Sequence, residues 1–104
     1  MDHTEKRRYP RTRVNLAAEV LQSAPGPVTA VIDLSEGGAC LDWSMSDAIA
    51  VGAPLRLRFL LAGKQTIEVD GRVVRIGAGH AGVEFLPAQQ DVVRQLLAES
   101  RSED

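Results

Sequence analysis

Three arginines near the N-terminus have the residue type and spacing needed to bind a compact anion: Arg7, Arg8 and Arg11. Arg7 and Arg11 are four residues apart in a stretch that has no helical apolar period. An arginine guanidinium donates two parallel hydrogen bonds to phosphate oxygens or to the O6/N7 edge of guanine, and its plane can stack on a purine. Two such groups on a non-helical segment can approach a flat ligand from different sides. These residues therefore favour an anion that carries phosphate or a purine base.

A second polar run, about twenty residues later, pairs a carboxylate with a hydroxyl and a glycine. It reads Asp-x-Ser-x-x-Gly, from Asp33 through Ser35 to Gly38. Asp33 can accept hydrogen bonds from the N–H groups of guanine, and Ser35 would lie on the same side of an extended segment. Gly38 lets the backbone approach a ligand without a Cβ in the way. Taken alone, the pattern is also typical of an ordinary turn, because Asp and Ser accept from backbone donors and Gly tolerates positive φ.

No set of residues for catalysis or metal binding can be assembled from the sequence. The histidines His3 and His80 are not at metal-ligand spacing from each other or from Cys40, the only cysteine. Ser35 lacks a Gly-x-Ser-x-Gly elbow, and no P-loop is present. We therefore expect that the chain is not an enzyme and has no metal or cofactor.

Positive charge is concentrated at the N-terminus. Residues 1–13 contain five of the twelve lysines and arginines, although the formal net charge of the chain is −2. A basic arm on an acidic body produces a local positive field that suits an anion of limited size. The acidic remainder and the small number of aromatic residues argue against nucleic acid as a partner.

The apolar pattern predicts one all-β domain after this arm. Residues 14–21 alternate with a period of two, and short turns separate them from further strand-like segments at 28–34, 39–43, 54–61, 66–76 and 81–86. No long helix separates these segments, so an antiparallel barrel or sandwich is expected. The predicted boundaries are 1–13 for a flexible basic arm, 14–101 for the barrel and its helix, and 102–104 for a tail.

From Pro87 the period changes to that of a helix, which is predicted to run to about Arg101 and to pack on the barrel. The longest apolar-leaning run is interrupted by Arg56 and Arg58 and is too short to span a bilayer. The N-terminus does not resemble a signal peptide, and a single cysteine fits a reducing compartment. A cytoplasmic protein without membrane insertion is expected.

Together, the two motifs resemble those of PilZ domains, the bacterial receptors of the second messenger cyclic di-GMP. Both family motifs, Arg-x-x-x-Arg and Asp/Asn-x-Ser-x-x-Gly, are complete here, at Arg7 and Arg11 and at Asp33, Ser35 and Gly38. Segments 71–75 and 82–85 and the C-terminal helix also resemble the family pattern. The resemblance implies a six-stranded antiparallel β-barrel with a C-terminal α-helix, and cyclic di-GMP as the ligand.

The resemblance also implies a role for each motif residue. Arg7 and Arg11 would clamp guanine and phosphate groups of the ligand. Asp33 and Ser35 would hold a guanine edge and a nearby phosphate from the barrel surface. Gly38 would keep the approach to that surface open.

The cations next to the arginine motif are also expected to take part in binding, and two other functions are possible for a chain with this pattern. Lys6 and Arg8 would add contacts, and the arm would fold onto the barrel to create a surface that a downstream protein reads. One alternative is a PilZ-fold interaction module that does not bind nucleotide. The other is a general nucleic-acid binder that uses the basic arm.

Overall fold

The computed structural model describes residues 12–21, 26–43 and 50–101. These ranges contain six strands, two short 3-10 helices and one α-helix. In chain order the elements are β1 (Thr12–Leu21), β2 (Val28–Leu34), β3 (Gly38–Asp42), β4 (Pro54–Leu60), η1 (Ala62–Lys64), β5 (Thr66–Gly77), β6 (His80–Phe85), η2 (Pro87–Gln89) and α1 (Gln90–Arg101).

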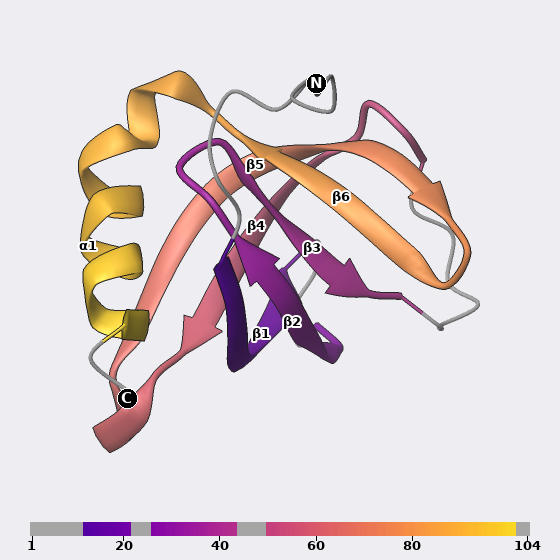
Figure 1. Cartoon of the computed structure of the whole chain (residues 1–104). Coiled ribbons are helices and arrows are strands. Elements are labelled where there is room, and N and C mark those ends of the chain that lie inside the picture. Colours follow the sequence, from indigo (N-terminus) through magenta and orange to yellow (C-terminus); the bar gives the residue numbers. More distant parts are fainter. Residues whose placement is uncertain (1–11, 22–25, 44–49, 102–104) are drawn as a thin grey trace, which may run out of the picture.

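The six strands form one closed antiparallel barrel in the order β1-β2-β3-β6-β5-β4, as Figure 1 shows. Two pairings between distant parts of the sequence close it: β3 pairs with β6, and β4 pairs with β1. The β5–β6 turn is made by Ala78 and Gly79, both at positive φ, which matches the twist of the flanking strands. The predicted six-stranded barrel with a C-terminal helix is confirmed.

The barrel interior is filled by aliphatic and aromatic side chains that alternate along the strands with outward-facing residues. Leu34, Leu57 and Phe59 are completely buried. The rings of Phe59 and Phe85 meet edge to face, with their centroids 6.3 Å apart and an interplanar angle of 83°. This arrangement suits the quadrupoles of the two rings and adds to the gain from removing them from water. The strands that carry the candidate site are therefore anchored in a continuous core.

Helix α1 lies beside β5 in Figure 1 and also packs against β1. Its side chains Val93, Leu96 and Leu97 are buried in the same cluster as the barrel core. The helix thereby extends the core beyond the barrel instead of forming a second one. Among the described residues, no helix has the length and apolar character needed to cross a bilayer.

Two boundaries differ from those predicted by more than one residue. Strand β1 begins at Thr12, two residues before the apolar alternation starts, because Thr12 pairs with Leu34 and Arg13 pairs with Asp33. Pro87 opens a separate 3-10 turn, and the α-helix itself begins at Gln90. Pairing with β2 thus extends β1 beyond its apolar residues. The α-helix is shorter than its apolar stripe, because a 3-10 turn precedes it.

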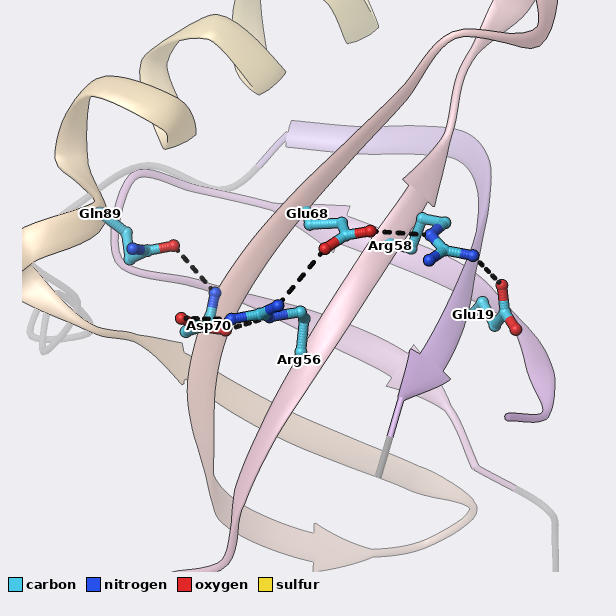
Figure 2. A network of polar contacts seen from close by, with 6 residues as sticks. All are labelled: Glu19, Arg56, Arg58, Glu68, Asp70 and Gln89. Carbon is cyan, nitrogen blue, oxygen red and sulfur yellow. Dashed lines mark hydrogen bonds and ion pairs between the residues drawn. The ribbon is translucent and has the colours of Figure 1, made fainter. Parts of the chain in front are cut away.

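Figure 2 shows a ladder of charged side chains that crosses the outside of β1, β4 and β5. Arg56 Nε donates to Asp70 Oδ1 at 2.6 Å, and Arg58 Nε donates to Glu68 Oε2 at 3.0 Å. Arg58 Nη1 reaches Glu19 Oε1 on β1 at 3.1 Å. Because these two arginines are already paired with carboxylates, this face is unsuited to binding an anion.

Asp70 is expected to stabilise the fold at neutral pH and to lose that effect in acid. The hydrogen bond from Arg56 lowers the pKa of the Asp70 carboxyl below its ordinary value. A group whose pKa is lowered by folding contributes fully above its unfolded pKa, about 3.9, and its contribution disappears as the pH falls through the folded pKa. The effect is small, since the Arg56 side chain is 52% exposed and the pair is screened by solvent.

Urea unfolding of the parent and of Asp70→Asn tests this prediction. The midpoints should differ at pH 7 and approach each other at about pH 3 or below. In an Arg56→Gln background, Asp70→Asn should change the midpoint much less at either pH. A separation between parent and variant that stayed constant down to low pH would contradict the assignment.

Candidate functional site

The loop that joins β2 to β3 is tied together by the hydroxyl of Ser35. Ser35 Oγ accepts hydrogen bonds from the backbone N–H of Gly37 at 3.1 Å and of Gly38 at 3.2 Å. The Ser35 N–H donates to the Gly38 carbonyl at 2.9 Å, which closes the turn. Ser35 is buried, so these bonds are made with little competition from water.

The Ser35 side chain has a structural role within its own loop. The expectation that strand alternation sets its direction does not apply, because β2 ends at Leu34 and Ser35 lies in the turn. Its hydroxyl faces the backbone of its own loop. Ser35 therefore fixes the shape of the loop that follows Asp33.

Gly38 is required by the neighbouring strand. A Cβ at this position would lie 2.1 Å from the carbonyl oxygen of Val83 and 3.3 Å from the Cα of Glu84, both on β6. Gly38 is the register partner of Glu84, and the Phe85 N–H donates to the Gly37 carbonyl at 2.9 Å. The absence of a side chain thus allows β6 to hold the loop closely.

Asp33 sits at the last outward-facing position of β2. It is half-buried and directly precedes Leu34, which is completely buried in the core, so strand alternation places the carboxylate on the outer surface. The pairing between β2 and β3 shifts register between Val31 and Asp33. Such a bulge locally re-aims the side chains around it.

The first residues of β1 lie next to these motif residues. Thr12 pairs with Leu34, and Arg13 pairs directly with Asp33. Sequence reasoning counted Arg13 in the basic arm but did not select it as a site residue. Only the register of β1 against β2 reveals the pair, and the sequence offers no signal for that register.

The arginine motif itself lies outside the described residues. Arg7, Arg8 and Arg11 all precede Thr12, where the described chain begins. The structure therefore brings Asp33, Ser35 and Gly38 together in one short segment and places the start of β1 beside it. The contribution of the three arginines remains a prediction.

Metal chemistry finds no support in the described part of the chain. Within residues 12–21, 26–43 and 50–101, no group of three or more His, Cys, Asp or Glu side chains could hold an ion. His80 is exposed at the start of β6, and Cys40 is buried on β3.

A comparison with models of protein families matches the PilZ domain over residues 5–101. The chain belongs to the PilZ domain family. The matched range includes both motifs and every element of the barrel. PilZ domains are non-enzymatic receptors and adaptors, so family membership confirms the expectation that this chain is not an enzyme.

Solved structures of other PilZ proteins show the same fold. The PilZ domain of CeSA from a cellulose-synthesizing bacterium is 25% identical, with a TM-score of 0.69 over 86% of this chain and 95% of that one. The PilZ domain of Escherichia coli YcgR with cyclic di-GMP is 17% identical, with a TM-score of 0.74 over 94% of this chain and 91% of that one.

The Bacillus subtilis inhibitor of motility, MotI/DgrA, is 19% identical, with a TM-score of 0.71 over 99% of this chain. This PilZ chain spans 55% of the length of that Bacillus protein. A search of curated protein sequences found no significant match.

Proposed function

We propose that this PilZ domain is a receptor for cyclic di-GMP, which it binds between its N-terminal arginine motif and the end of β2. The observation that carries the proposal is the pairing of Thr12 with Leu34 and of Arg13 with Asp33. It places the start of β1, which follows the arginine motif directly in the sequence, beside Asp33 at one end of the barrel. Family membership and a related domain with cyclic di-GMP support the choice of ligand.

The covalent chain limits how far the arginines can lie from Asp33. Arg11 is bonded to Thr12, so their Cα atoms are about 3.8 Å apart. Arg7 is five residues from Thr12 and can be at most about 18 Å away. Because an arginine side chain adds several ångströms to this reach, both guanidinium groups can meet a ligand that rests on Asp33.

Each motif residue has a distinct part in the proposal. Arg7 and Arg11 clamp guanine and phosphate groups with paired charge-assisted hydrogen bonds, and Arg8 adds positive charge. Asp33 accepts from the N–H groups of one guanine. Ser35 keeps the loop in position through its bonds to Gly37 and Gly38.

Binding is proposed to order the arm on the barrel, and the resulting surface signals to a partner protein. Ordering the arm costs conformational entropy, so we expect an affinity on the order of micromolar, about −8 kcal/mol. A receptor of this kind would need no catalytic group. Its output is the change of surface that the ordered arm creates.

Calorimetric titration of the chain with cyclic di-GMP, GTP and a short single-stranded oligonucleotide tests the function. Saturable binding of cyclic di-GMP, with weak or no binding of the other two, supports a receptor. Binding of all three with a steep salt dependence would indicate a general nucleic-acid binder. Binding of none would indicate that the fold serves protein contact alone, and either of these two results would overturn the proposal.

A further inference from the structure

Arg13 on β1 and Asp33 on β2 lie opposite each other on the outer surface of the barrel. They are register partners, and the next pair towards the start of β1 is Thr12 with Leu34. Because Leu34 is completely buried, its pair faces the interior and the Arg13–Asp33 pair faces outwards. Register partners on antiparallel strands have Cα atoms about 5 Å apart. We call Arg13 and Asp33 the cross-strand pair.

Two irregularities of strand pairing meet at the cross-strand pair. The register of β1 against β2 shifts between Arg13 and Leu16, and that of β2 against β3 shifts between Val31 and Asp33. Such irregularities re-aim the side chains around them and are over-represented next to active sites. The pair therefore occupies a part of the surface that departs from regular sheet geometry, at the place where the ligand is proposed to bind.

The charge of Arg13 is not used within the fold. Its side chain is exposed. Within residues 12–21, 26–43 and 50–101, no carboxylate forms an ion pair with Arg13, whereas three arginines elsewhere on the barrel have carboxylate partners: Arg56, Arg58 and Arg72. A cation without a carboxylate partner can bind a ligand without first giving up an ion pair. The Arg13 guanidinium is thus available beside Asp33.

The cross-strand pair has the hydrogen-bonding groups that match a guanine base. Guanine has N–H donors at N1 and N2, and next to them the acceptors O6 and N7. A carboxylate only accepts hydrogen bonds and a guanidinium only donates them. Asp33 can therefore take the N–H groups, while the planar fork of Arg13 donates to O6 and N7 of the same base. Adenine carries an N–H₂ donor in place of O6, so it would face Arg13 with the wrong group.

We propose that Arg13 determines specificity for guanine, by donating to O6 and N7 of the base whose N–H groups are bound by Asp33. The proposal rests on the function proposed above and adds a base contact to it. Because Arg13 belongs to β1, this contact comes from the barrel itself. The arginines of the N-terminal motif then serve the phosphates and the second guanine of cyclic di-GMP.

A comparison of two ligands in the parent and in Arg13→Ala tests this contact. The ligands are cyclic di-GMP and its analogue with 7-deazaguanine in place of both guanines, which lacks the N7 acceptors. Arg13→Ala should weaken cyclic di-GMP binding about tenfold or more, the effect of losing one bidentate base contact. In the parent the analogue should bind several-fold more weakly than cyclic di-GMP, and in Arg13→Ala this difference should be clearly smaller.

Arg13→Lys separates the guanidinium fork from its charge. Lysine keeps the charge but cannot donate two parallel hydrogen bonds. The variant should therefore also show a smaller difference between the two ligands than the parent does. If Arg13 instead binds a phosphate, its removal should weaken both ligands by the same factor, which would overturn the base contact.

Arg94→Ala is the matched protein control, because Arg94 is also exposed and has no ion pair in the described part of the chain. It should keep the parental affinity for both ligands, and all variants should keep the thermal midpoint within a few degrees. Cyclic di-IMP, which lacks the N2 amino groups, is the matched ligand control. Loss of those groups should cost the same in the parent and in Arg13→Ala, but less in Asp33→Asn.

The result also distinguishes this proposal from the receptor function. If the parent binds cyclic di-GMP and Arg13→Ala shows the parental difference between the two ligands, Arg13 does not contact the base, although the receptor function stands. If the parent does not bind cyclic di-GMP, both proposals are overturned.

Discussion

Arg7→Ala and Arg11→Ala are each expected to weaken cyclic di-GMP binding by at least about 100-fold. A guanidinium that makes two charge-assisted hydrogen bonds contributes roughly 3 kcal/mol or more, and 1.4 kcal/mol corresponds to a factor of ten. Both residues precede Thr12, where the first strand of the barrel begins, and we expect neither substitution to disturb the barrel core. The thermal midpoint should therefore stay within a few degrees of the parent while binding is lost.

Arg94→Ala is the matched control for these variants. Arg94 is exposed on α1, and its removal changes the net charge by the same amount. If the arm acts only through long-range charge, all three variants should weaken binding equally, and modest salt should abolish the differences. If the arm clamps the ligand, Arg94→Ala should bind like the parent. Parental affinity in Arg7→Ala or Arg11→Ala would exclude the clamp.

Gly38→Ala is expected to destabilise the whole domain by at least about 3 kcal/mol. The added Cβ would lie 2.1 Å from the Val83 carbonyl oxygen, so β3 and β6 must separate. That movement disturbs the strand pairing that closes the barrel and the hydrogen bond from Phe85 N–H to the Gly37 carbonyl. For a domain of about this size, the thermal midpoint should fall by roughly 12 °C or more.

Gly77→Ala is the appropriate comparison, because a Cβ there would meet no atom within 4 Å and the backbone is not at positive φ. Its thermal midpoint should equal or slightly exceed that of the parent. If Gly38→Ala unfolded at the parental temperature and lost only ligand binding, then the absence of a side chain at this position would be needed for the ligand and not for β6. That result would contradict the explanation based on β6.

Local pattern was sufficient to predict most of the fold. Strand β2 has the predicted bounds, because β-branched residues and turn residues mark both of its ends. The start of β1 was predicted two residues late, since Thr12 and Arg13 join the strand by pairing with β2 and not by apolar alternation. Propensity and periodicity report what a side chain prefers locally, whereas pairing depends on a partner strand elsewhere in the chain.

The candidate site could likewise be predicted only in part, because local sequence indicates residue types but not strand pairing. The residue types of Asp33, Ser35 and Gly38 were recognisable, because hydrogen-bonding groups and glycine follow a short-range spacing. The structural roles of Ser35 and Gly38 could not be predicted from that spacing. The Ser35 hydroxyl binds the backbone of its own loop, and Gly38 leaves room for β6. The pairing of Arg13 with Asp33 could not have been predicted, because it depends on the register between β1 and β2, which lie apart in the sequence.

The central claim is that cyclic di-GMP binds where the start of β1 meets the end of β2. Amide chemical-shift mapping by NMR during a cyclic di-GMP titration tests it directly. We expect the largest shifts at Thr12, Arg13 and residues 33–38, while Arg56 and Glu68 on the charged ladder remain unchanged. Shifts concentrated on β4 and the ladder face of β5, or no shifts at saturating ligand, would contradict the claim.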